Sequence, residues 1–462
     1  MRTNYPGLGN FPWDKRLTIL VFLAVATVSV VVGFAYMSMG FWVIIGGIAA
    51  AALSIFLFSS PRALVLTVFV AKPFVDMLWF AKSDVGGMGL NASSVLSVVI
   101  VIGALIFIAV HRIELQRGVL APMLLVLLMN VWAIHETGDL VYSVQYVIRV
   151  VCGFPLVFIV PLIVGQLPTP RRMLQLFFAV MLVVCLTVLL QPAGLIPYTS
   201  FDADGLARAT GFYYHPWDVA RYVVILIPLC FAMVDEPGRE RLARNWPYWL
   251  LLVLGLATTY FTYLKAAWLA VLFQILLWLY LTRRKRIALA VLVVTVVLVA
   301  FPLRHGFVSV FSDLWKLSSA ETRGQALSGR VFLWGQYWQG LRTAGLREIL
   351  LGEGFLPPGW SATGYAVHDD YLRLLVMTGV FGFIAYWGLM IAALRELRRA
   401  VKRLADRHGL EHRIGMATEC LLAAYFLMGI TADPSSYPSL TLYLWLLIGL
   451  VIGYSHVEPE SS

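Results

Sequence analysis

The chain has 462 residues, of which 60% are apolar and 13% are charged. A soluble domain is about 45–50% apolar and about 25% charged, so this composition excludes an ordinary soluble enzyme and indicates a polytopic membrane protein. The formal net charge of +10 would suggest nucleic-acid binding in a soluble protein. Here the basic residues cluster in short connections between apolar segments, as the positive-inside rule expects, and we expect no nucleic-acid partner.

The sequence gives no sign of a metal site, a disulfide or a nucleotide cofactor. All four cysteines lie inside apolar runs without metal-ligand spacing, which is typical of small core residues; they are Cys152, Cys185, Cys230 and Cys420. Neither a Walker A motif nor a dinucleotide-binding fingerprint is present. The N-terminal segment lacks the features of a signal peptide, so we expect the first apolar run to remain a membrane helix.

Helix length predicts the architecture. A bilayer core of about 30 Å needs about 20 apolar residues of helix, which predicts an all-α fold with twelve to fourteen membrane helices in one transmembrane domain, 1–462. Our preferred count of fourteen has helices near 17–36, 41–59, 62–80, 94–110, 118–135, 143–164, 173–191, 217–233, 248–263, 266–282, 287–302, 370–392, 414–430 and 438–455.

The basic residues predict the orientation. If the N-terminus is cytoplasmic, every dense Lys/Arg cluster falls on that side, including 283–286 and a basic cytoplasmic connector at 393–413. The loops 81–93, 192–216 and 303–369 then lie on the outer side, which is the periplasm in a Gram-negative bacterium. ATP is absent there, so a synthetic reaction on that side needs an already activated substrate. The 303–369 loop is long enough to hold a small helical unit.

Ionisable side chains near the outer ends of helices are candidate functional groups, because charges in membrane segments are costly. Arg208 and His215 lie in the 192–216 loop, Arg221 lies one turn inside the helix that follows, and Lys265 stands at the end of another helix. Each also has a structural interpretation. Arg221 and Lys265 can extend to the membrane interface, and His215 can be an ordinary loop residue.

The large outer loop contributes Arg330 and His368. Arg330 precedes aromatic residues at helical spacing, so it can also flank an amphipathic helix on the membrane surface. His368 comes directly before a membrane helix that Asp369 or Asp370 is expected to cap. Taken together, several cations and a histidine on one face suit a lipid substrate that bears a diphosphate, because Arg binds phosphate oxygens through a planar fork and His accepts a proton near neutral pH.

Three stretches resemble the O-antigen ligase/polymerase superfamily of bacterial membrane enzymes. They are RATGFYYHPW at 208–217, SGRVFLW at 328–334 with LGEGF at 351–355, and HDDYLRLLVMTGVFG at 368–382. The resemblance covers roughly residues 200–392. The chain departs from the family pattern at Lys265, within a segment where Ser-Arg-Gly is common, and at Trp217 and Asp369, where Asn is common.

The resemblance implies a GT-C-like bundle and a metal-independent, inverting glycosyl transfer without a cofactor. The donor would be a glycan on undecaprenyl diphosphate, and the enzyme would lie in the bacterial inner membrane with its active site facing the periplasm. His368 would act as the base. Cationic side chains would neutralise the diphosphate, with Arg330 as the second catalytic residue and with Lys265, Arg221, Arg208 and His215 as binding residues.

Three functions remain open. A polymerase of the Wzy type would use a second lipid-linked repeat unit as acceptor, and a chain-length regulator protein is a candidate partner. The stretch HDDYLRLL, with its acidic pair and Arg373, resembles exopolysaccharide polymerases more than ligases, and this resemblance favours the polymerase. An O-antigen ligase would instead transfer the glycan to lipid A–core. A transporter of lipid-linked oligosaccharide or of ions is the alternative from a different class, although broken midplane helices in two matching halves, which would support transport, are not evident.

Overall fold

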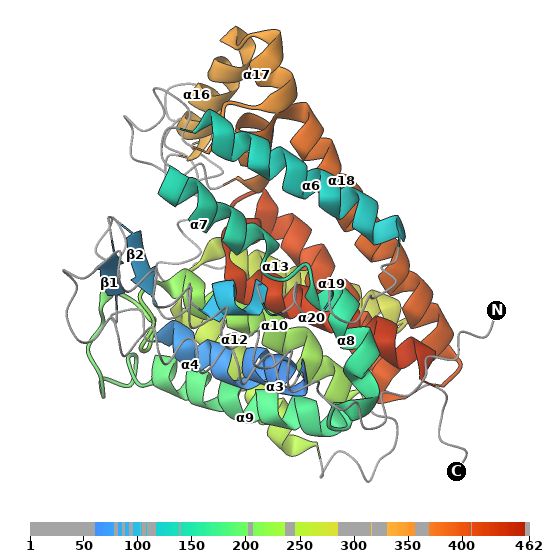
Figure 1. Cartoon of the computed structure of the whole chain (residues 1–462). Coiled ribbons are helices and arrows are strands. Elements are labelled where there is room, and N and C mark those ends of the chain that lie inside the picture. The colour runs from blue at the N-terminus through green and yellow to red at the C-terminus, as the bar shows by residue number, and fades with distance from the viewer. Residues whose placement is uncertain are drawn as a thin grey trace.

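The protein is described by a computed structural model (Figure 1). It covers residues 61–77, 82–85, 88–91, 96–101, 103, 108, 117–137, 140–201, 207–235, 245–284, 316, 330–355, 369–407 and 409–457. The helices expected near 17–36, 41–59 and 287–302 lie outside these residues, as does most of the one expected near 94–110. His368 and most of the 303–329 segment also lie outside them.

The described chain is mostly helical, which confirms the predicted class. The helical elements are α3 (Pro61–Leu66), η1 (Thr67–Ala71), α4 (Lys72–Met77), α6 (Arg117–Glu136), α7 (Leu140–Val151), α8 (Leu156–Ile163), η2 (Val164–Gln166), α9 (Pro170–Leu189), α10 (Pro216–Val234), α12 (Trp246–Phe261), α13 (Lys265–Leu281), α16 (Arg330–Thr343), α17 (Leu346–Leu351), α18 (Asp370–Ala405), α19 (Leu410–Gly429), η5 (Pro434–Ser436) and α20 (Pro438–His456).

Six helical spans in the described residues are long and apolar enough to cross a membrane, so the chain is a multi-pass membrane protein. They are Gly118–Glu136, Ser143–Gln166, Pro170–Leu189, Pro216–Val234, Asp370–Ala405 and Pro438–His456. α12 and α13 are apolar but shorter. α10 and α20 are almost completely buried and form the centre of the core. The full count of fourteen stays a prediction.

Two short antiparallel hairpins interrupt the helical pattern, which the expectation of an all-α fold did not anticipate. β1 (Lys82–Val85) pairs with β2 (Met88–Asn91), and β3 (Ser200–Phe201) pairs with β4 (Ala207–Arg208). Both lie in predicted outer loops, at 81–93 and 192–216. Each loop returns close to its starting point, so local pairing satisfies backbone groups that have no helical partner.

The helix predicted over 62–80 is irregular and contains a buried ion pair. A π-helical segment, η1, separates α3 from α4. Lys72 and Asp76 form an ion pair. They are four residues apart, a spacing that brings two side chains together on one face of a helix. The Tyr222 hydroxyl donates a hydrogen bond of 2.5 Å to the other Asp76 oxygen. Lys72 is fully buried, so this pairing offsets part of the cost of removing its charge from water.

α18 is the longest helix and differs most from its prediction. It begins at Asp370, as expected, but it breaks at Gly379 and continues to Ala405. The basic connector expected at 393–413 is mostly occupied by the end of α18 and the start of α19, so it is helical, as its sequence predicts. In Figure 1 α6 runs alongside α18, and α16 and α17 lie at the upper end of this pair.

Candidate functional site

The candidate site is built around the first turn of α18. Asp369 caps the helix, because its side chain accepts a hydrogen bond of 2.9 Å from the backbone N–H of Leu372. This confirms the capping that the sequence predicts, since Asp satisfies an N–H that has no partner within the helix. Burial raises the pKa of the Asp369 carboxyl. The cap fixes the direction in which the chain enters α18.

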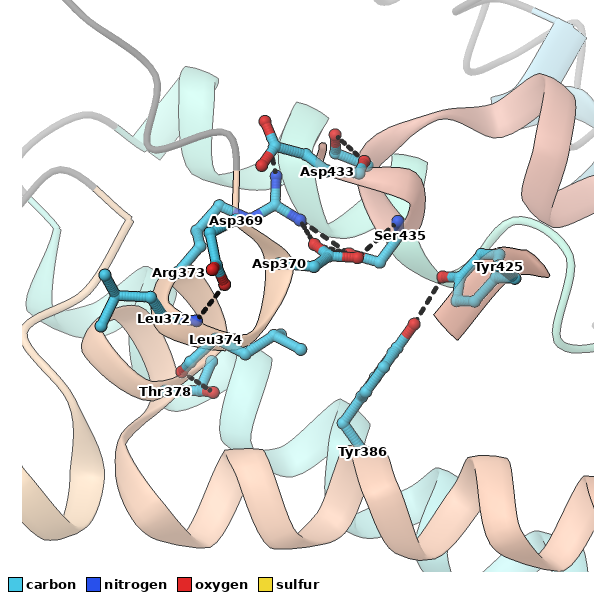
Figure 2. Close-up of polar contacts among 11 residues, drawn as sticks. Asp369, Asp370, Leu372, Arg373, Leu374, Thr378, Tyr386, Tyr425, Asp433 and Ser435 are labelled. Atoms are coloured by element: carbon cyan, nitrogen blue, oxygen red, sulfur yellow. Dashed lines mark hydrogen bonds and ion pairs between the residues drawn. The ribbon is translucent and has the colours of Figure 1, made fainter. Parts of the chain in front are cut away.

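Asp370 and Arg373, one turn apart, are joined to the turn between α19 and α20 (Figure 2). Arg373 donates hydrogen bonds to the Asp370 carboxylate and, at 2.7 Å, to the Ser435 hydroxyl. Ser435 donates to Asp370 through its hydroxyl at 2.8 Å and through its backbone N–H at 2.9 Å. A carboxylate oxygen of Asp433 lies 3.7 Å from a guanidinium nitrogen of Arg373. We call Asp370, Arg373, Asp433 and Ser435 the α18 cluster.

The α18 cluster is buried throughout. Buried charges are tolerated when they are paired and hydrogen-bonded, and here two carboxylates surround one guanidinium group. The Arg373 guanidinium also lies over the Tyr146 ring of α7, 5.1 Å from its centroid, an arrangement that favours a cation. The cluster therefore ties together α7, α18 and the α19–α20 turn.

Arg221 approaches the same turn from α10. It is buried, donates a hydrogen bond of 2.9 Å to Asp218, and places its guanidinium carbon 3.1 Å from the centroid of the Tyr437 ring. Burial raises the pKa of the Tyr437 hydroxyl, whereas the positive charge of Arg221 lowers it. Tyr437 directly follows η5, so the structure places Arg221 beside the turn that holds the α18 cluster.

Arg208 and Lys265 are carried by two segments in direct contact. The backbone N–H of Ala209 donates a hydrogen bond of 2.9 Å to the carbonyl of Phe261, at the end of α12. Lys265 is the first residue of α13, four positions further on, and follows Tyr263, whose φ is 52°. Both cationic side chains are half-buried. The β4 segment and the α12–α13 turn therefore meet, as a shared site requires.

His215 has a structural role at the start of α10. Its Nδ1 accepts a hydrogen bond of 3.2 Å from the backbone N–H of Trp217, while Asp218 accepts one of 3.2 Å from the His215 backbone. This reciprocal arrangement is a capping box. Pro216 occupies the first helical position, where the N–H that proline lacks would have no partner within the helix. His215 is exposed, and its Nε2 takes no part in the cap.

The structure describes only part of the predicted site. Arg330 is the half-buried first residue of α16, and α16 packs against α18. A helix after Arg330 confirms the predicted helical spacing there. Arg330 thus lies in a helix beside α18, whereas Arg221 lies beside the α19–α20 turn. The site shared by all six predicted residues therefore stays a prediction, and the position of His368 lies outside the described residues.

Sequence reasoning missed Tyr146, Asp433, Ser435 and Tyr437. The last three lie in the segment ADPSSYP between two apolar helices, and the predicted orientation places this segment on the outer side. A polar turn on that side was the feature of the sequence that could have indicated these three residues. No such feature indicates Tyr146, because it is one of several aromatic residues in an apolar helix.

Among the described residues, no group of three His, Cys, Asp or Glu side chains is placed to hold a metal ion. Comparison with protein-family models and with curated proteins returns no match to this chain. The resemblance to the O-antigen ligase/polymerase superfamily therefore rests on the motif residues alone.

Proposed function

We propose that this chain is a membrane glycosyltransferase that polymerises oligosaccharide repeat units linked to undecaprenyl diphosphate, on the periplasmic face of the bacterial inner membrane. One observation carries the proposal. The stretch LGEGF at 351–355 packs directly on the stretch that begins at His368, through hydrogen bonds of 2.9 Å from Glu353 N–H to Val376 and 3.2 Å from Gly354 N–H to Met377. Two segments that carry the resemblance thus meet at the second turn of α18.

The proposed step is a direct displacement at the anomeric carbon of the donor sugar. A hydroxyl of the acceptor unit attacks this carbon, the bond to the diphosphate oxygen breaks, and the configuration inverts. The hydroxyl proton passes to His368. Undecaprenyl diphosphate leaves with the bonding electrons, and nearby cations stabilise its negative charge. No metal or cofactor takes part in the step as proposed.

The cations have different surroundings, which suggests different roles. Arg373 is already bound by Asp370 and lies close to Asp433, so we assign it to holding the first turn of α18, directly after His368. Arg221 faces one carboxylate and one aromatic ring. We assign Arg330 and Arg221 to the diphosphate, with Lys265, Arg208 and His215 as further contacts. Losing one such preorganised charge typically lowers the rate about 10²–10³-fold.

Reconstitution tests the proposal directly. The purified full-length chain is placed in liposomes with one defined undecaprenyl-diphosphate-linked repeat unit, with and without lipid A–core. A polymerase extends the repeat unit into a ladder without lipid A–core. Product that forms only on lipid A–core identifies a ligase, and lipid moved across the bilayer without new linkages identifies a transporter. Either of these results overturns the proposal.

The variant His368→Ala tests the assignment of the base. It is expected to abolish the ladder while the protein level and the helix content, measured by circular dichroism, stay unchanged. A near-normal ladder from this variant would exclude His368 as the base without excluding the polymerase.

A further inference from the structure

The segment Gly352–Glu353–Gly354 passes between two helices at very close range. Both glycines have left-handed backbones, with φ of 85° and 86°. A Cβ atom at Gly352 would collide with the carbonyl oxygen of Met377 in α18. A Cβ atom at Gly354 would lie 2.7 Å from the hydroxyl of Thr137, just beyond α6. Glycine is therefore required on both sides of Glu353.

α18 is broken at the place where this segment crosses it. Gly379 has φ of 65°, and a Cβ atom there would collide with the backbone of Leu350 in α17. The break lies beside the Val376 and Met377 carbonyls that accept from Glu353 and Gly354. Strained backbones of this kind persist where the surroundings fix them, and they cluster at functional sites. The position of Glu353 is thus defined from both sides.

The Glu353 side chain has no partner among the described residues. It is half-buried, and among the described residues it takes part in no hydrogen bond or ion pair. Burial raises the pKa of its carboxyl, and the neighbouring Glu348 raises it further. By contrast, Glu136 at the end of α6 forms an ion pair of 2.5 Å with Arg347. A partly desolvated carboxylate without a donor is unfavourable in the free protein.

The segment is physically connected to the α18 cluster. The backbone N–H of Phe355 donates a hydrogen bond of 2.8 Å to Thr137, and the Phe355 ring packs on the Tyr146 ring at a centroid distance of 4.7 Å. Tyr146 is the ring beneath the Arg373 guanidinium. Glu353 therefore belongs to the same assembly as the first turn of α18, two residues from a side chain that packs into it.

We propose that Glu353 binds the acceptor sugar, with its carboxylate accepting hydrogen bonds from adjacent hydroxyls of a pyranose ring. This inference rests on the proposed function. A negative charge repels the donor diphosphate, so Glu353 fits the acceptor side of the reaction. Neutral hydroxyl groups supply the missing donors, and two neighbouring hydroxyls match the two carboxylate oxygens. Glu353 is therefore a binding residue that sets acceptor specificity, while the proton is taken by His368.

The test separates acceptor from donor. A labelled repeat unit methylated at its acceptor hydroxyl serves only as donor, and the unmodified unit is varied as acceptor with the reconstituted full-length chain. Glu353→Gln is expected to raise the KM for the acceptor about 10- to 100-fold, because a charge-assisted hydrogen bond is lost. The KM for the donor is expected to stay within about twofold. Glu353→Asp keeps the charge and is expected to recover part of the acceptor affinity.

Asp406→Asn is the control, since it removes an exposed carboxylate at the far end of α18 and is expected to leave both KM values unchanged. If the wild type makes product and Glu353→Gln leaves the acceptor KM unchanged, the inference is overturned and the proposed function stands. An equal loss for donor and acceptor also overturns it, because that pattern indicates general damage. A wild type that makes no product with either unit overturns the proposed function and this inference together.

Discussion

The α18 cluster and the Gly352–Gly354 segment both hold carboxylates away from water, but they do so in opposite ways. Asp370 is surrounded by donors from Arg373 and Ser435. Glu353 has none among the described residues. Pairing suits a group that holds helices together, because its energy is realised in the free protein. A carboxylate without donors suits a group that is completed by a ligand.

The largest effect is expected from Arg373→Leu. The change removes the guanidinium that pairs with the buried Asp370 carboxylate, and breaking a buried ion pair in this way typically destabilises a protein by about 3–5 kcal/mol. Thermal unfolding of the detergent-purified chain measures this loss. Arg399→Leu is the control, because Arg399 forms an exposed ion pair with Glu396 and such a pair contributes about 0–1 kcal/mol. Equal losses from the two variants would contradict the structural role of the α18 cluster.

The second largest loss of stability is expected from Gly379→Ala. The left-handed backbone costs a residue with a Cβ atom about 1–2 kcal/mol, and the collision with α17 adds to this, so we expect a loss of about 2 kcal/mol or more. Gly335→Ala is the matched control, since a Cβ atom at Gly335 in α16 meets nothing within 4 Å and Ala favours helix by about 1 kcal/mol. A tolerated alanine at position 379 would show that the break in α18 is not fixed by glycine.

Asp369→Ala removes the cap of α18 and is expected to cost about 1 kcal/mol. Asp369→Asn keeps an oxygen that accepts from Leu372 N–H, so it should retain most of the stability. Chemical denaturation in mild detergent compares the two. Equal loss in both variants would mean that the charge of Asp369, rather than its cap, stabilises the first turn.

The smallest expected effect is that of Glu353→Gln, which should increase the stability of the protein. The pKa of the Glu353 carboxyl is higher in the folded protein than its ordinary value. Its contribution to stability is therefore fully present when the pH is below the ordinary pKa, and it is lost as the pH rises through the folded pKa. Glu353→Gln removes this loss and should stabilise the protein at pH 7 by less than about 1 kcal/mol, because the side chain is only partly desolvated. Melting temperatures between pH 4 and pH 8 test this. A less stable variant at pH 7 would indicate a structural role for Glu353.

The sequence predicted the elements better than their contacts. Helix length placed α9, α10 and α20, and local chemistry placed the cap of α18 at Asp369 or Asp370. The break at Gly379 was hidden because a glycine in an apolar run also fits a continuous membrane helix. Ser435 was missed because its partner, Asp370, is 65 positions away, and a polar turn in the sequence does not reveal which helix it contacts.

The central claim is tested most directly by counting products of a single reaction. The reconstituted chain is supplied with one defined lipid-linked repeat unit, and new glycosidic linkages and released undecaprenyl diphosphate are quantified together. A polymerase releases one undecaprenyl diphosphate for every linkage formed, while the glycan grows by whole repeat units. Recovery of the lipid-linked unit without new linkages or released diphosphate would contradict the account.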